Sequence, residues 1–225
     1  MDTGKKRGQT TALIAYETLI RQFKEEPRGK LYCLHGSPSV FRLSLSAATH
    51  ALLKGVPITL VDGTNRFDVY YITEFARRRH PDPGRLLENI FISRAFTCYQ
   101  MEAAITDRLP VFVRRIRSPI VIVFGLLDTF YDEQAPLFEV KAGLQRVITA
   151  LQALKQENVA VLLASVDTKL ASRERNALFP RLCSAMDRVF AVRENDGGSP
   201  RILLESPDRE KPAAVSHKNR ERRPT

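Results

Sequence analysis

The stretch Gly36-Ser37-Pro38-Ser39-Val40-Phe41-Arg42-Leu43 follows a short apolar segment, 31–34, and precedes a run with helical periodicity. A connection between a buried strand and a helix is where an α/β nucleotide-binding domain holds phosphate, with the pattern G-x-x-x-x-G-K-[ST]. The length agrees and the first glycine is present. The second glycine, the lysine and the Ser/Thr, which carry the chemistry of that loop, are replaced by Phe41, Arg42 and Leu43.

Apolar segments alternate with helical stripes along the rest of the chain. We expect strands at 31–34, 57–61, 89–93, 120–124, 159–165, 188–193 and 200–205. We expect helices at 10–24, 41–54, 68–79, 99–108, 137–157 and, in part, 173–185. Continuously apolar strands between helices are typical of a parallel sheet covered on both faces, and Asn195-Asp196-Gly197-Gly198-Ser199 indicates a hairpin. The sequence therefore predicts an α/β fold with a mostly parallel sheet, flanking helices and a C-terminal antiparallel hairpin.

The positive charge gathers at the two ends of the chain. The formal net charge is +10, and the predicted division is an N-terminal helix with a basic end (1–30), a core domain (31–207) and a basic tail (208–225) that we expect to be disordered. Basic tails attract polyanions such as nucleic acid. The alternative is a solvated tail that only aids solubility.

Several classes of protein are disfavoured by composition. No apolar run approaches the roughly 20 residues that span a bilayer, so we expect no membrane contact and a cytoplasmic location. Cys33, Cys98 and Cys183 lie far apart, without the spacing of a metal site. His35 has no catalytic partner nearby in the sequence and is interpreted as structural.

Four further stretches, taken in order, carry a family resemblance. Residues 58–67 end a strand on an acid, Asp62, with a phenylalanine shortly after; residues 89–97 end on Arg-Ala-Phe-Thr; 120–124 form the most apolar strand; and 201–207 close the core. Together these stretches resemble the ATPase core of the RecA-like recombinase family over about 31–207. The resemblance implies a RecA-like, P-loop NTPase-type core.

The catalytic positions that the resemblance implies are altered. Phe124 stands where the family has the acid of its Walker B strand, Asp128 comes four residues later, and Thr64 replaces an acid that would activate water. Since phosphoryl transfer depends on positioning and charge stabilisation by such groups, we expect no catalytic residue, no metal site and no cofactor. The alternative is an atypical site that binds ATP and Mg²⁺, with Arg42 in place of the lysine. The degenerate nucleotide loop comprises Gly36, Ser37, Ser39, Arg42, Ser44, Asp62 and Asp128.

The stretch after 159–165 occupies, by resemblance, the loop with which recombinases contact single-stranded DNA. Its cations could follow a phosphate backbone, and the alternative is a solvated connection. With the tail, the candidate DNA-binding residues are Lys169, Arg173, Arg175, Arg181, Lys218, Arg220, Arg222 and Arg223.

The resemblance and the altered positions together favour a non-catalytic RecA-like paralogue. It would act as an accessory in DNA recombination or repair, binding DNA, a partner recombinase or another RecA-like subunit. The alternatives are the atypical ATP-binding protein and a scaffold subunit of a hetero-oligomer with no role on nucleic acid.

Overall fold

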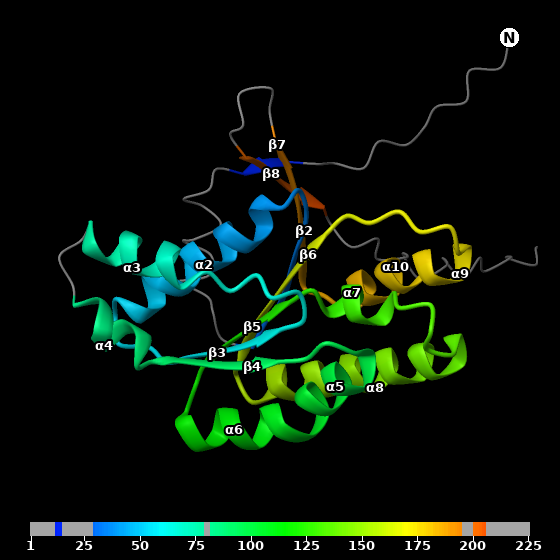
Figure 1. Ribbon diagram of the computed structural model, residues 1–225, viewed down its shortest axis with the longest axis horizontal. Coiled ribbons are helices and arrows are strands. Elements are labelled where there is room, and N and C mark those ends of the chain that lie inside the picture. The colour runs from blue at the N-terminus through cyan, green and yellow to red at the C-terminus, as the bar shows by residue number, and fades with distance from the viewer. Residues whose placement is uncertain (1–11, 15–28, 79–81, 195–199, 206–225) are drawn as a thin grey trace, which may run out of the picture.

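A single mixed sheet forms the centre of the molecule (Figure 1). The computed structural model describes residues 12–14, 29–78, 82–194 and 200–205. The strand order is β1-β8-β7-β2-β6-β5-β3-β4, in which the strands from β7 to β4 run parallel, β8 is antiparallel to β7, and β1 is antiparallel to β8. The strands are β1 Ala12–Ile14, β2 Leu31–Gly36, β3 Ile58–Asp62, β4 Ile90–Arg94, β5 Ile120–Phe124, β6 Ala160–Val166, β7 Arg188–Glu194 and β8 Pro200–Glu205.

Helices cover both faces of the parallel part of the sheet. One face carries α2 Ser39–Leu52, α3 Val69–Arg77 and α4 Pro83–Leu87. The opposite face carries α5 Cys98–Ala103, the π-helix η1 Ala104–Arg108, α6 Leu109–Ile116, α7 Leu126–Phe130, α8 Leu137–Gln156, α9 Arg173–Asn176 and α10 Leu178–Ser184.

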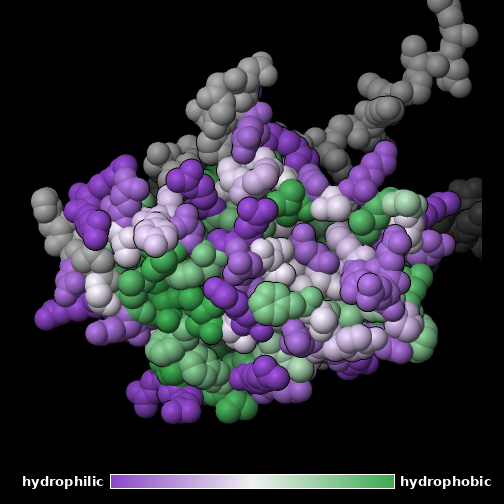
Figure 2. Space-filling model, in the orientation of Figure 1, coloured by the Kyte–Doolittle hydropathy of each residue, from purple (hydrophilic) through white to green (hydrophobic). Residues whose placement is uncertain are grey.

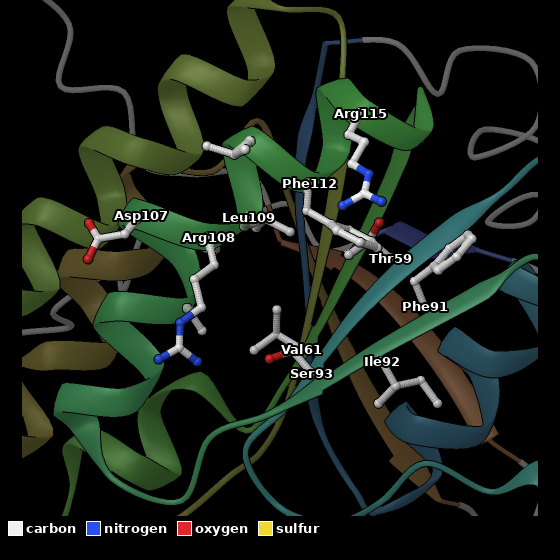
Figure 3. Close-up of a pocket in the computed structure, with 12 residues that line it drawn as sticks. Thr59, Val61, Phe91, Ile92, Ser93, Asp107, Arg108, Leu109, Phe112 and Arg115 are labelled. Atoms are coloured by element: carbon white, nitrogen blue, oxygen red, sulfur yellow. The ribbon is translucent and has the colours of Figure 1, made fainter.

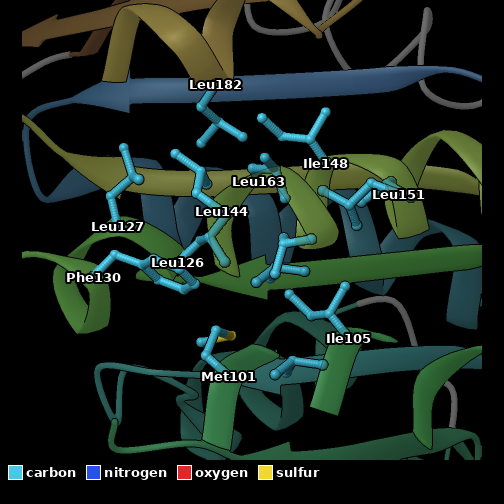
Figure 4. Close-up of a cluster of buried hydrophobic side chains, with 14 of the residues drawn as sticks. Met101, Ile105, Leu126, Leu127, Phe130, Leu144, Ile148, Leu151, Leu163 and Leu182 are labelled. Carbon is cyan, nitrogen blue, oxygen red and sulfur yellow. The ribbon is translucent and has the colours of Figure 1, made fainter. Parts of the chain in front are cut away.

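The core follows from the alternation of side chains along each strand. In β5, Ile122 and Phe124 point towards α2, whereas Val121 and Val123 point towards α8. The buried side chains form one cluster on each face of the sheet. Figure 4 shows the cluster on the α8 side, in which Leu144 and other leucines of α8 pack against the sheet. A strand that is buried on both faces must be apolar throughout, and this explains the unbroken apolar run of 120–124.

The structure confirms the predicted α/β class, the mostly parallel sheet and the C-terminal antiparallel pair. The bounds of β5 and β8 agree with the prediction. The expected helix at 10–24 is wrong for 12–14, which form β1. The physical reason is that β8 offers an edge of unpaired backbone groups, and β1 pairs with it. The remainder of that predicted helix, the hairpin tip at 195–199 and the tail lie outside the described residues.

The helical layer around 98–116 also differs from the prediction. The sequence predicts a helix at 99–108 and none between it and the strand at 120–124. Instead the chain passes through η1 into α6, with Pro110 in the first turn of α6, where its missing N–H is tolerated. Among the described residues, no helix combines the length and the apolar character needed to cross a membrane.

Candidate functional site

The connection from β2 to α2 is tighter than a phosphate loop. α2 begins at Ser39, two residues before the predicted start at Phe41, because Pro38 already has helical dihedral angles (φ −56°, ψ −18°). The N–H of Val40 donates to the carbonyl of Ser37 at 3.1 Å, and that of Phe41 to the carbonyl of Pro38 at 3.4 Å. These backbone donors are thus engaged within the turn, whereas a phosphate loop points its N–H groups at the ligand.

Gly36 is required by packing against β7. Its φ is +126°, and a Cβ at this position would lie 2.1 Å from the carbonyl oxygen of Val192. The next N–H, from Ser37, donates to the same oxygen at 2.9 Å, and the hydroxyls of Ser37 and Ser39 lie 2.5 Å apart. The glycine that matches the nucleotide-loop pattern therefore serves the junction between β2 and β7.

Two phenylalanines fill the space beside this turn. Phe41 is 5% exposed, and its ring meets that of Phe124 edge to face, with centroids 5.1 Å apart and an interplanar angle of 68°. Such pairs gain about 0.5–1.5 kcal/mol beyond their apolar burial. The resemblance places these two residues at the positions of the loop glycine and of the Walker B acid, and the structure brings their rings into contact.

Arg42 and Ser44 lie in different surroundings, one at the surface and the other in the core. Arg42 is exposed, with its guanidinium 5.1 Å from the ring centroid of Tyr71 on α3. Ser44 is fully buried and donates its hydroxyl to the carbonyl of Val40 at 2.8 Å. A serine committed to its own helix has no geometry for holding Mg²⁺ beside Arg42.

Asp62 holds the loop after β3. Its buried carboxylate accepts the N–H groups of Thr64 and Arg66, each at 3.1 Å, and of Phe67 at 2.9 Å. These three hydrogen bonds explain why an acid ends the strand, and no bound ligand is needed to explain it. The hydroxyl of Thr64 is buried with no hydrogen-bond partner among the described residues.

Asp128 lies in the first turn of α7, beyond the end of β5. Burial raises the pKa of its carboxyl above the ordinary value, and the nearby charge of Arg66 only partly opposes this. One of its oxygens, Oδ2, is buried and has no partner within the described part of the chain. Asp128 is therefore the acid of the predicted loop that keeps one carboxylate oxygen, Oδ2, without a donor within that part.

The predicted DNA loop divides into exposed and buried cations. Lys169 and Arg173 are exposed, and Arg181 is exposed but donates to the side-chain oxygen of Gln145 at 2.8 Å. Assigning Arg175 to this set is wrong. Its side chain is buried and donates to the carbonyls of Phe130, at 3.0 Å, and Ala135, at 2.6 Å. Phe130 ends α7 and Ala135 lies in the connection that follows, and the guanidinium supplies a donor to both carbonyls.

Lys218, Arg220, Arg222 and Arg223 lie outside the described residues, so their predicted DNA contacts stay predictions.

A network around His35 is missed by sequence reasoning. His35 Nδ1 lies 2.7 Å from a carboxylate oxygen of Asp167, and Nε2 lies 3.1 Å from Glu205. Asp167 also accepts from Arg193 at 2.8 Å, and the imidazole meets the ring of Phe179 at 4.8 Å. The partners stand 132 and 170 residues away in the chain, so no local pattern could reveal them. The network joins β2, β7, β8 and Asp167, the residue that follows β6, which agrees with a structural role for His35.

No group of histidine, cysteine, aspartate and glutamate within the described ranges is arranged to hold a metal ion. No protein-family model matches the chain, and no curated protein matches it.

The burial of Arg175 leads to a stability prediction. Replacing Arg175 by Met leaves the two carbonyls without a donor in a buried place, and we expect the free energy of unfolding to fall by about 2–4 kcal/mol. Urea denaturation measures this. Arg173→Met, a matched change at an exposed neighbour, should alter stability by about 0.5 kcal/mol or less; equal effects of the two substitutions would contradict the assignment.

The network around His35 leads to a pH prediction. Burial acts to raise the pKa of Asp167, but the hydrogen bonds and charges of His35 and Arg193 outweigh it and lower the pKa. A lowered pKa in the folded state stabilises above the unfolded pKa of about 4, and this stabilisation is lost as pH falls through the folded value. Asp167→Asn should therefore be less stable than the parent at pH 7, with the difference shrinking below about pH 4.

Denaturant titrations at intervals of about one pH unit between roughly pH 2 and 8 measure this difference in the free energy of unfolding. Glu133→Gln, a change in an exposed loop acid, serves as control. A difference between parent and Asp167→Asn that stays constant with pH would contradict the account of the network.

Proposed function

We propose that this chain is a non-catalytic RecA-like subunit that assists DNA recombination or repair by docking a partner recombinase or another RecA-like subunit. Two features of the described residues support the proposal. The phenylalanine pair occupies the place of a phosphate loop, and an apolar pocket opens beside the last strand of the sheet. The pocket is the main support for the proposal, because it provides a surface on which a partner can bind.

The pocket lies between the edge strand β4 and the helical segment η1–α6 (Figure 3). Its volume is about 460 Å³, and its walls are apolar side chains of β3, β4 and α6. The hydroxyl of Thr59 lines it, is buried, and has no hydrogen-bond partner among the described residues. Arg108 and Arg115 stand at its rim, together with one acid, Asp107. The pocket therefore suits an apolar anchor flanked by acidic or polar groups.

The surface around the pocket is exposed and apolar. Ile92 on β4 is 42% exposed and Val111 on α6 is 64% exposed. Figure 2 shows hydrophobic residues gathered on the lower left of the visible face, over β4 and α6. In the described part of the sheet β4 has a neighbour on one side only. An edge strand beside an apolar pocket fits β-augmentation, in which an extended segment adds a strand and inserts a side chain.

Nucleic acid is the second ligand of the proposal. The net charge of +10 and the exposed Lys169 and Arg173 support attraction to a phosphate backbone. Arg175 no longer contributes to that support. If a partner binds and DNA does not, the alternative of a scaffold subunit holds; if Mg-ATP binds, the atypical nucleotide site holds.

Site-specific photo-crosslinking in the native cell tests the docking surface. A crosslinking amino acid at position 92 or 111 should capture a RecA-fold protein, identified by mass spectrometry, because both positions border the pocket. The matched control is position 138, since Phe138 is 73% exposed but lies on α8 outside the pocket. We expect about tenfold less capture there, and about tenfold weaker co-purification of the same partner after Ile92→Asp.

Capture of the same protein from all three positions would contradict the assignment of the surface. Recovery of the partner by Ile92→Asp at the level of the parent would do so as well.

A further inference from the structure

A second cleft lies on the opposite helical layer, between α2 and α3. Its volume is about 1220 Å³, which exceeds the roughly 300–1000 Å³ of most small-molecule pockets. It is open to solvent, and residues of α2, α3 and the β3–α3 connection line it. Neither the filled nucleotide loop nor the pocket beside β4 includes the α3 wall of this cleft.

Two arginines in this cleft form cation–π contacts with aromatic rings. The guanidinium of Arg42 lies 5.1 Å from the ring centroid of Tyr71, and that of Arg66 lies 5.8 Å from that of Phe41. Phe41 and Arg42 are consecutive in α2, so both guanidinium groups come to the N-terminal end of that helix. Both arginines are exposed, and among the described residues neither forms an ion pair.

Two of the three acids that line the cleft are engaged with groups of α3 and its caps. Glu74 pairs with Arg78 at 2.5 Å. Asp68 caps α3, accepting the N–H of Tyr71 at 3.0 Å. Glu194, at the end of β7, also lines the cleft. Arg42 and Arg66 are thus the cations of the lining that form no ion pair within the described ranges, although the charge of Arg66 acts on the buried carboxyl of Asp128 and opposes its raised pKa.

We propose that this cleft binds a single-stranded nucleic acid, with Arg42 and Arg66 on successive phosphates and a base stacked against the Arg42–Tyr71 pair. Guanidinium groups bind phosphate through paired N–H donors and also stack on bases, and aromatic platforms beside a cationic groove are typical of single-strand binding. Phe75, half-buried in the same wall, extends the apolar side of the cleft. The inference gives the nucleic-acid half of the proposed function a specific surface and does not depend on partner docking at β4.

The direct test is binding of a fluorescent oligothymidylate to the full chain, measured by anisotropy over a series of salt concentrations. Each phosphate contact in a single strand contributes about −0.7 to the slope of log K against log salt. Arg42→Ala/Arg66→Ala should therefore weaken binding about tenfold or more and make the slope shallower by about 1.4. The matched control is Lys54→Ala, an exposed cation in the turn after α2 and outside the cleft lining.

A second variant separates the cleft from the basic tail. Lys218, Arg220, Arg222 and Arg223 are replaced together by serine in the full-length chain. If this variant loses binding and the double arginine variant binds like the parent, the cleft is not the binding site. The proposal that the protein binds DNA would then still hold, with the tail as its site. Absence of binding by the parent overturns both the cleft and the nucleic-acid half of the proposed function, whatever the crosslinking at positions 92 and 111 shows.

Photo-crosslinking gives a readout that a purely structural role would not produce. An oligonucleotide carrying 5-iodouracil should form an adduct on a peptide that contains Tyr71. Adducts confined to other peptides would overturn the stacking assignment. Equal affinity for a mononucleotide and for the oligonucleotide would show a nucleotide site in place of a strand site.

Discussion

The ring of Phe41 packs edge to face on the ring of Phe124 where β5 ends and α2 begins, with centroids 5.1 Å apart. Both residues belong to the cluster between the sheet and α2, and both are almost fully buried. A phosphate site at this place would need a loop without side chains and an acid at the end of the strand. The pair supplies apolar contact instead, so the junction contributes to stability without exposing polar donors.

The remaining geometry of the loop agrees with this contact. With Phe41 turned inward, the next residue along the helix, Arg42, points to the surface and stacks on Tyr71. Ser44, one turn after Val40, returns its hydroxyl to the helix. Asp62 is saturated by backbone donors of its own loop. The connection from β2 to α2 is a structural junction, and the pocket beside β4 and the cleft between α2 and α3 are the surfaces of the described residues to which we assign binding.

Sequence patterns predict the parts of this structure that depend on local periodicity. The run at 120–124 had to be a buried strand, and the alternation of strands and helices had to give a covered parallel sheet. Contacts between distant residues could not be predicted. Arg175 reads as a surface cation, yet it donates to carbonyls 40 and 45 residues earlier in the chain. His35 finds its carboxylates only after β6 and β8 are placed, and β1 forms because β8 needs a neighbour.

Calorimetric titration of the full chain with Mg-ATP tests whether the packing of Phe41 on Phe124 leaves no phosphate site at the connection from β2 to α2. We expect no saturable heat up to about 1 mM nucleotide, which corresponds to a binding free energy weaker than roughly −4 kcal/mol. Saturable binding in the micromolar range that disappears in Arg42→Ala but is unchanged in Arg66→Ala would contradict it, because the phosphate would then bind at the β2–α2 connection, which the structure fills with Phe41 and Phe124, and not in the cleft that holds both arginines.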